Sequence, residues 1–356
     1  MKRLTDNKQG IAAIPALLGI VIIAALFLVP KFVQSTYALH MMILIFISII
    51  MGSGWNLLGG YTGQYSVGHA AYFGVGAYTT MILLQYRHIA PWYGIWAGIV
   101  MAMIVALIIG SICFRLRGPY FVLASIAVAE IFRVSALNLS FTNGAEGILI
   151  TEIPPFTIGN AVVTDFMTKV PFYYTGLVIV LIVIFVTWKM QNSKLGYYCQ
   201  AIREDQDAAH SLGINLSLYK NIALSLSAIF TSLAGSLYGL YVGFIDPSTV
   251  LALDLSVQIV MTVIIGGIGT IFGPVIGALV LVPFSEALRS NMIAQALIDS
   301  GLVREDSGVG MFLKDQLSHA HVLIYGILLV VVILYMPDGV MGFARKIAAK
   351  RRKEAA

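Results

Sequence analysis

Long apolar runs separated by short polar connections extend over nearly the whole chain. A helix that crosses a bilayer needs about 20 mostly apolar residues, and ten stretches reach or approach that length. The predicted spans are 11–29, 38–58, 66–84, 93–114, 119–137, 171–189, 220–244, 255–267, 275–290 and 321–336. The eighth and ninth are short and glycine-linked, which leaves two tilted spans or a broken, re-entrant pair open. The pattern predicts an all-α polytopic membrane protein of about ten transmembrane helices, some of them short or broken.

Composition supports a membrane-embedded chain. Of its 356 residues 59% are hydrophobic and only 11% are charged, and the mean hydropathy is +0.89. Soluble domains contain roughly 45–50% apolar and about 25% charged residues, so a soluble enzyme, a disordered scaffold and a small secreted disulfide protein are excluded. The two cysteines, Cys113 and Cys199, form neither a disulfide framework nor a metal-ligand pattern. We therefore expect no metal site and no catalytic site.

The basic residues predict the orientation. With the N-terminus in the cytoplasm, most of the 22 lysines and arginines fall on the cytoplasmic side, as the positive-inside rule requires. We expect one transmembrane domain over 1–342, with both termini cytoplasmic and a basic tail at 343–356. That tail is expected to contact anionic lipid and no nucleic acid. Two long connections remain, an outer cap loop at about 138–170 and an inner loop at about 190–219.

The inner loop carries the most informative pattern. Small and apolar side chains recur on one face of a single predicted helix, interrupted by one acid: Tyr198, Ala201/Ile202, Ala208/Ala209 and Leu212, with Asp205 between them. Gly213 stands where a left-handed C-cap belongs, and Asn215 is suited to cap a second, short helix. Such a helix is suited to docking into a groove of a soluble partner. A solvated connector between two spans is the alternative.

Several segments together resemble a known family. The segment 201–215 is similar to the coupling-loop motif of LivM-type permeases, the membrane subunits of high-affinity branched-chain amino-acid ABC importers. Segments 55–78, 116–121, 142–147, 266–274 and 336–342 also resemble the motifs of that family. The resemblance covers residues 56–342. It departs from the family at 197–200, before the coupling motif, and at 143–146.

The resemblance implies the ABC importer permease fold and a bacterial inner-membrane location. It implies a second permease (LivH-type), two ABC ATPase subunits and a periplasmic substrate-binding protein as partners. The cargo it implies is a branched-chain or hydrophobic amino acid, and permeases for urea or short-chain amides are close relatives. The ATPase-coupling residues it implies are Ala201, Arg203, Glu204, Asp205, Ala208, Ala209, Leu212 and Gly213. No Gly-Lys dipeptide occurs, so this chain has no P-loop, and ATP and magnesium are expected on the partner subunits.

A glycine-rich polar segment within the membrane is the second candidate site. Its candidates for the translocation path are Gln64, Ser66, Gly68, His69 and Tyr72. Polar groups on a glycine-broken helix are tolerated at membrane depth where they line a cavity or pack against protein. Direct substrate contact and a tight helix crossing therefore both remain open.

Charged residues within spans form the third signal. Glu130, a further path candidate, lies three residues before Arg133, and Glu286 lies three before Arg289. At this spacing an acid and a base can pair on one helix face. Charges in a bilayer are costly unless paired or hydrated, so either a structural pair or a polar lining near the outer gate is expected.

Two other classes of function compete with an importer subunit. A secondary transporter needs a mid-span ion or proton relay, for which Glu130 and His69 are the only weak candidates. A membrane-embedded enzyme needs a motif such as HExxH or GxSxG, and neither occurs. The sequence therefore favours a non-catalytic permease subunit.

Overall fold

The computed structural model describes most of the chain, namely residues 19, 21–33, 35–158, 161–164, 166, 168–289, 326–327, 330, 334–335 and 339–342. The segment 291–320 and the predicted basic tail at 343–356 lie outside the described residues, as does most of the predicted span 321–336. Of the predicted first span, only the part from residue 19 is described, and there an apolar helix runs over Val21–Phe32.

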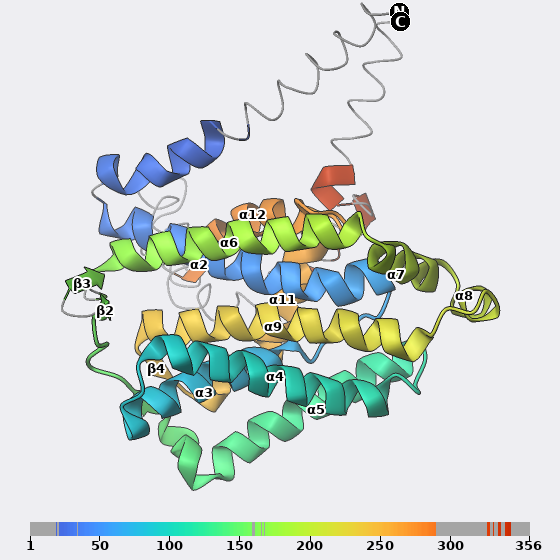
Figure 1. The fold of residues 1–356 in the computed structure, drawn as a ribbon, viewed down its shortest axis with the longest axis horizontal. Helices are drawn as coiled ribbons and strands as arrows, with labels where there is room; N and C mark the ends of the chain where they lie inside the picture. The colour runs from blue at the N-terminus through green and yellow to red at the C-terminus, as the bar shows by residue number, and fades with distance from the viewer. Residues whose placement is uncertain are drawn as a thin grey trace, which may run out of the picture.

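The long helices form a bundle, in which α2, α4, α6 and α9 run roughly parallel and α5 is inclined to them (Figure 1). They are α2 (Thr36–Trp55), α3 (His69–Arg87), α4 (Pro91–Cys113), α5 (Pro119–Asn138), α6 (Lys169–Gln191), α9 (Leu216–Val242), α11 (Leu253–Gly266) and α12 (Gly273–Arg289). A π-helix, η1 (Asn56–Gly60), continues α2. The shorter elements are α7 (Lys194–Glu204), α8 (Gln206–Ser211), α10 (Pro247–Val250), two 3₁₀ turns at Ser140–Thr142 and Gly144–Glu146, β1 (Ile148–Leu149), β2 (Phe156–Ile158), β3 (Ala161–Thr164) and β4 (Phe244–Ile245).

Six helical stretches among the described residues are long and apolar enough to cross a membrane, which supports a multi-pass, all-α membrane protein. They are Thr36–Gly60, Pro91–Cys113, Pro119–Asn138, Lys169–Gln191, Leu216–Val242 and Pro247–Gly266. Val21–Phe32 and Gly273–Leu288 are shorter apolar helices. The predicted total of about ten stays a prediction. The predicted span 66–84 forms α3, which packs against α4, α9 and α11, and its polar residues His69 and Thr80 are fully buried.

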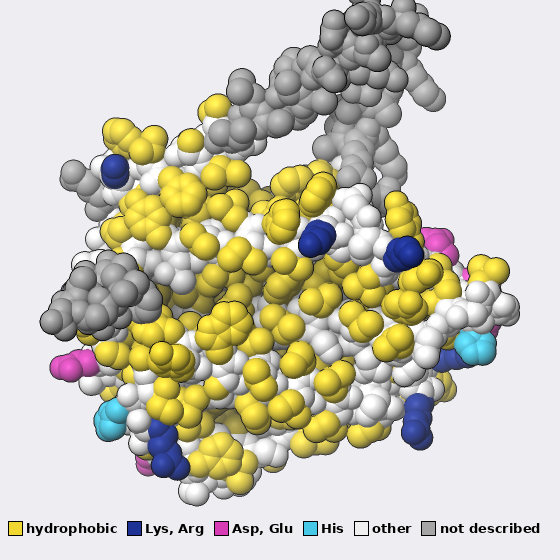
Figure 2. Space-filling view, in the orientation of Figure 1, with side chains coloured by type: hydrophobic (Ala, Val, Ile, Leu, Met, Phe, Trp, Pro, Cys, Tyr) yellow, Lys and Arg dark blue, Asp and Glu magenta, His cyan; other side chains and the backbone are white. Residues whose placement is uncertain are grey.

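The helices divide into central and peripheral ones. In the most apolar 18-residue stretch of Thr36–Gly60, which comprises α2 and η1, 83% of the residues are buried inside the protein. In the corresponding stretches of α4 and α5, only 22% are buried. Peripheral helices such as α5 expose large apolar side chains, among them Tyr120 and Leu123. Hydrophobic side chains cover most of the middle of one face, and charged ones lie toward its two ends (Figure 2). This arrangement suits a bundle whose outer surface contacts lipid.

Small residues let α3 approach α9 closely. A Cβ on Gly235 would lie 2.0 Å from the carbonyl oxygen of Phe73, and one on Gly76 would lie 2.2 Å from that of Ser232. These contacts involve backbone and leave no room for a side chain. Gly243, by contrast, ends α9 with a φ of 76° and an N–H bond to the Gly239 carbonyl, so it is a cap rather than a packing position.

The predicted short spans 255–267 and 275–290 form α11 and α12. Their backbones nearly touch, because a Cβ on Gly266 would lie 1.8 Å from the carbonyl oxygen of Gly273. Both helices also pack against α2. With 14 residues, α11 rises about 21 Å, less than the hydrocarbon thickness of about 30 Å. The preceding α10 is separated from it by a break at 251–252, so this stretch is a discontinuous helix.

The two ends of the bundle differ. One end carries α7 and α8, and we call it the α7–α8 end; the opposite end carries the β2–β3 hairpin and is the hairpin end (Figure 1). At the hairpin end, the predicted cap loop 138–170 contributes β1, which pairs antiparallel with β4 through Ile148 and Ile245. The connection between α11 and α12 reaches the α7–α8 end, where Asn56 bonds to it.

Candidate functional site

The inner loop forms two helices rather than the single predicted one. Asp205 has an extended backbone, with φ −155° and ψ 117°, and separates α7 from α8. Its carboxylate oxygen Oδ1 accepts hydrogen bonds from the backbone N–H groups of Asp207 (2.8 Å) and Ala208 (3.0 Å). The acid that interrupts the apolar stripe is therefore the N-cap of α8, a role that aspartate favours.

The predicted cap at Gly213 is confirmed. Its φ is +83°, its N–H donates to the carbonyl of His210 (2.9 Å), and the Ile214 N–H donates to that of Ala209 (3.1 Å). This pair of bonds is the Schellman motif. Asn215 also caps a helix as predicted, since its Oδ1 accepts from the Leu218 N–H at 3.1 Å, but that helix is the long α9 rather than a short one.

The predicted coupling residues divide between a packed and an exposed group. Ala209 is buried and Ala201 is partly buried, and Ile202 next to it is buried as well. The exposed members are Arg203, Glu204, Asp205, Ala208, Leu212 and Gly213. Leu212 is 81% exposed, an unusual position for a leucine at the tip of a projecting helix. α7 and α8 extend beyond the ends of the long helices (Figure 1), so this tip is free to contact another molecule.

Arg203 connects this projection to the membrane helices. Its Nη1 donates to the carbonyl oxygen of Gly60, in η1, at 2.6 Å. The same nitrogen would lie 2.5 Å from a Cβ on Gly269, so glycine at that position makes room for the guanidinium. An arginine from α7 thus reaches both the end of α2 and the connection between α11 and α12.

Asn56, also in η1, makes the second connection. Its Nδ2 donates to the carbonyl oxygen of Thr270 at 2.9 Å, and its Oδ1 accepts from the Gly269 N–H at 2.8 Å. The side chain is fully buried, so both bonds form away from water. A π-helix is rare and is frequently found at functional sites. We call Asn56, Gly60, Arg203, Gly269 and Thr270 the inner network.

Two further contacts hold α8 in place. Lys220 of α9, 2% exposed, donates from Nζ to Oε1 of Gln206 at 2.8 Å. Arg117 pairs with Asp207 at 2.9 Å, but both side chains are well exposed, so this ion pair adds little to stability.

The predicted path residues lie together but are enclosed by neighbouring helices. Gln64, Ser66, His69 and Tyr72 are all at most 4% exposed. His69 shares a 2.7 Å hydrogen bond with Ser227 of α9 through Nε2. The Ser66 carbonyl accepts from the Trp55 indole at 2.6 Å. These contacts are those of a tight helix crossing.

Gly68 and Glu130 occupy different surroundings. A Cβ on Gly68 would lie 2.3 Å from the carbonyl oxygen of Ser125, so this glycine allows α5 to cross closely. The predicted pairing of Glu130 with Arg133 is confirmed, because Arg133 donates from Nε (2.9 Å) and Nη2 (2.6 Å) to its two carboxylate oxygens. The pair lies on the exposed surface of α5. The Arg289 side chain, and with it the second predicted pair, lies outside the described residues.

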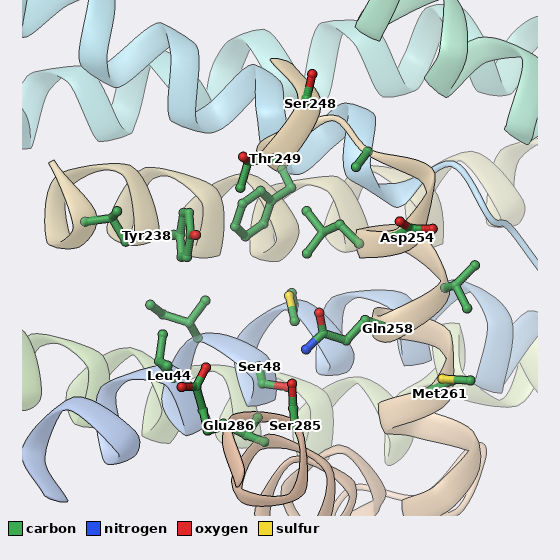
Figure 3. A pocket seen from close by; sticks show the side chains of 18 of the residues that line it. Leu44, Ser48, Tyr238, Ser248, Thr249, Asp254, Gln258, Met261, Ser285 and Glu286 are labelled. Carbon is green, nitrogen blue, oxygen red and sulfur yellow. The ribbon is translucent and has the colours of Figure 1, made fainter. Parts of the chain in front are cut away.

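A cavity of about 710 Å³ occupies the half of the bundle toward the hairpin end. Its wall is built from α2, α9, α10, α11 and α12, with single contributions from Phe73 of α3 and from Gly326. The side chains shown in Figure 3 include Ser48 of α2, Gln258 of α11 and Ser285 and Glu286 of α12, which lie near one another in that view. None of the six predicted path residues is among the described residues that line it.

Each helix presents a regular face to this cavity. α2 contributes Leu44, Ile47, Ser48 and Met51, α11 contributes Asp254, Val257, Gln258 and Met261 together with Leu255 beside them, and α12 contributes Val282, Ser285 and Glu286. These positions follow the i, i+3, i+4, i+7 spacing of one helix face. Each face carries a single uncharged polar residue, Ser48, Gln258 or Ser285, and one such residue on a helix is too weak a signal to predict a cavity from the sequence. Among the described residues, no group of three or more His, Cys, Asp or Glu side chains is placed to hold a metal ion.

Comparison with known proteins gives consistent matches. The profile of a family described as branched-chain amino acid transport system / permease component matches residues 37–333. The chain is 28% identical to the high-affinity branched-chain amino acid transport system permease protein LivM of Escherichia coli K12, over 82% of this chain and 74% of that protein. Against LivM of Salmonella typhimurium the identity is 29%, over 72% of this chain and 65% of the relative, just under two thirds of its length.

A second kind of permease also matches. LivH of Escherichia coli K12, which carries the same transport-system name, is 24% identical over 86% of this chain and 92% of its own length. No solved structure matches the chain.

Proposed function

The chain belongs to the family of branched-chain amino acid transport permeases, and from this membership we propose that it forms part of the membrane pathway of an ATP-driven importer. The proposed cargo is a branched-chain amino acid, because that cargo appears in the family description and in the names of the LivM and LivH relatives. No feature of the described residues favours urea or an amide instead.

The observation that carries this function is the α7–α8 projection joined to the membrane helices by Arg203. A force applied to α8 reaches α2 and the α11–α12 connection through one 2.6 Å hydrogen bond and the adjoining bonds of Asn56. The exposed Leu212 and Ala208 supply the surface that a partner would grip. In this proposal the projection takes its shape from Ala201, Ala209 and Gly213. The junction between α7 and α8 is formed by Arg203, Glu204 and Asp205.

The partners follow from the same proposal. The importer comprises this chain, a LivH-type permease, two ABC ATPase subunits that bind ATP and magnesium, and a periplasmic binding protein. ATP binding moves the permease only if the ATPases bind one of its conformations more tightly than the other, and α8 is where that difference acts. This chain then needs no nucleotide site or catalytic group of its own.

The proposed orientation places the α7–α8 end in the cytoplasm of a bacterial inner membrane. By their elements, the basic residues near that end include Arg115, Arg117, Lys189, Lys194, Arg203 and Lys220, and the acids there are Glu204, Asp205 and Asp207. Near the hairpin end, Arg87 and Lys169 are basic, and Glu146, Glu152 and Asp246 are acidic. This distribution agrees with the positive-inside rule. With ten spans, both termini would also be cytoplasmic.

Reconstitution tests the proposal. Liposomes that hold this chain alone, this chain with its LivH-type partner, or the full assembly with binding protein and internal ATP are compared for uptake of labelled leucine. Uptake only by the full assembly is expected. Uptake by this chain alone would identify a secondary transporter and overturn the proposal.

Cross-linking locates the coupling contact. In the variant Ala208→Cys, a short bifunctional reagent is expected to capture an ATPase subunit, whereas Glu152→Cys at the hairpin end serves as the matched control and captures none. Equal capture at both positions would contradict a docking role for α8.

The predicted path residues are tested separately. Their enclosed positions make Gln64 and His69 supports of the helices beside the path. Variants Gln64→Ala and His69→Ala, compared at equal membrane abundance, are expected to lose uptake in proportion to lost stability. Lost uptake at unchanged stability would place these side chains in direct contact with the cargo.

A further inference from the structure

The cavity near the hairpin end has the size of a small-molecule site. Its volume is about 710 Å³, and ligand pockets in proteins enclose roughly 300–1,000 Å³. Its wall comes from both parts of the discontinuous α10–α11 stretch, and substrate sites of transporters typically form at such broken helices.

The wall combines an apolar lining with a few polar groups. Leu44, Ile47 and Met51 of α2 face Leu255 and Met261 of α11 across it, and Phe73 adds an aromatic ring. These apolar side chains suit the aliphatic part of a small ligand, while Ser48, Gln258 and Ser285 of the same wall can meet its polar groups.

Charge in the cavity has a single sign among the described lining residues. Asp254 and Glu286 contribute carboxylates, and no lysine or arginine is present among them. Asp254 lies one helical turn before Gln258 on α11, while Glu286 belongs to α12 on another side of the cavity (Figure 3). Asp254 is exposed and Glu286 is partly buried, and carboxylates attract a cation and repel an anion.

Among the described residues, five buried polar side-chain atoms have no hydrogen-bond partner, and one of them, Ser48 Oγ, belongs to a residue that lines the cavity. The Ser48 side chain is 2% exposed and lines the cavity, and its Oγ has no hydrogen-bond partner among the described residues. A buried hydroxyl is normally satisfied, so a polar group inside the cavity would complete this one.

We propose that this cavity holds a free amino acid with an aliphatic side chain during transport, its ammonium group facing Asp254 and Glu286. The apolar faces of α2 and α11 contact the side chain, and the hydroxyl and amide groups of Ser48, Gln258 and Ser285 face its polar end. This inference rests on the proposed function, since it names the place where this chain meets the cargo.

Charge-neutralising variants of the complete importer test the site. Asp254→Asn and Glu286→Gln are each expected to lower leucine uptake roughly tenfold to a hundredfold, the usual effect of losing one hydrogen bond to a charged group. Glu152→Gln, which changes an exposed acid at the same end of the bundle, is the matched control and is expected to leave uptake unchanged. Wild-type uptake by both cavity variants would overturn the inference.

Thiol labelling tests the same cavity without relying on transport. The native cysteines are buried, and burial raises the pKa of the Cys199 thiol to about 12, so both are expected to react slowly. In Ser285→Cys, the ratio of the reaction rates with a cationic and an anionic methanethiosulfonate is expected to be roughly tenfold higher than the same ratio for a free small thiol such as 2-mercaptoethanol, and leucine or isopentylamine is expected to slow the reaction. 4-Methylpentanoate, which lacks the ammonium group, is expected to give no protection.

The outcomes separate the two proposals. If the wild-type assembly imports no amino acid, the proposed function fails, and protection of Ser285→Cys by the amine still reports on the cavity. If the wild type imports leucine but labelling shows no charge preference and no protection, the cavity inference fails alone. Protection by sodium ions as strong as that by the amine would also overturn it, because the site would then select any cation.

Discussion

The inner network and the cavity stand at opposite ends of the same three helices and are built in opposite ways. At the α7–α8 end, α2, α11 and α12 are joined through Asn56 and Arg203 by bonds of 2.6–2.9 Å. Backbones there approach so closely that a Cβ on Gly277 would lie 1.7 Å from the Thr262 carbonyl oxygen. Toward the hairpin end, the same helices separate around a cavity of about 710 Å³.

This difference shows how a permease can combine rigidity with movement. Close packing transmits displacement, because it leaves no free volume to absorb it. A cavity allows displacement, since its walls can move without collision. A push on α8 therefore passes through the inner network with little loss and is expected to alter the cavity, where the helices have room to move. Each prediction below changes one of the two regions and asks whether the other behaves differently.

The largest effect is expected where backbones touch. In Gly266→Ala the new methyl group would lie 1.8 Å from the Gly273 carbonyl oxygen, so α11 and α12 must separate, at or above the upper end of the usual cost of overpacking, about 3 kcal/mol. We expect loss of monodisperse purified protein and a large fall in melting temperature. Gly239→Ala is the control, because its methyl group meets side chains and no backbone, namely the flexible Met81 at 3.3 Å and Ile245 at 3.6 Å. Equal melting temperatures would show that the α7–α8 end is not tightly packed.

Asn56→Ala is expected to have the next largest effect. It removes two buried hydrogen bonds and leaves the Gly269 N–H and the Thr270 carbonyl unpaired. Together these losses are expected to lower the free energy of unfolding by about 2–4 kcal/mol. Asn192→Ala removes a single bond, to the Trp188 carbonyl, at an exposed site and is expected to be nearly neutral. Thermal unfolding in detergent measures both, and similar shifts would contradict a structural role for Asn56.

The sequence predicted the parts of this comparison that depend on local patterns. The span 119–137 became Pro119–Asn138, and 255–267 became Leu253–Gly266, because apolar length alone defines such helices. Gly213 was placed correctly, since a left-handed cap favours glycine. Asp205 was not, because the apolar stripe continued across it and concealed a helix boundary that an N-cap residue signals.

Features that depend on contacts between distant segments were not predictable in this way. Arg203 was taken from its motif, and nothing in the sequence indicated its bond to Gly60, 143 residues away. The cavity was missed for the same reason: Ser48, Gln258 and Ser285 are single polar residues on three helices, and only packing brings them together. His69 was noticed because it is polar, but polarity alone does not distinguish a path residue from one bonded to Ser227.

Arg203→Ala separates coupling from folding. The guanidinium bonds to the Gly60 carbonyl from an exposed residue of α7, so its loss should leave the bundle folded. We expect leucine uptake by the full assembly to fall roughly tenfold, while ATP hydrolysis continues. Arg115→Ala, an exposed arginine near the same end, is the control and is expected to transport normally. Unchanged uptake in Arg203→Ala would show that its hydrogen bond to Gly60 is not needed to couple the α7–α8 projection to the membrane helices.

The smallest effect is expected inside the cavity itself. Ser48→Ala removes a buried hydroxyl that has no hydrogen-bond partner among the described residues, so the folded protein loses no bond and is relieved of an unsatisfied polar group. We expect the melting temperature to stay the same or to rise slightly, with a gain of at most about 1 kcal/mol in the free energy of unfolding. Asn56→Ala, in the π-helix that continues α2, is expected to lower it instead. Thr187→Ala on α6, whose buried hydroxyl donates to the Val183 carbonyl at 2.8 Å, is the matched control with a satisfied group and is expected to be destabilised. A larger loss for Ser48→Ala than for Thr187→Ala would mean that the Ser48 hydroxyl is bonded within the folded chain. The cavity would then have no buried hydroxyl left for a ligand at this position.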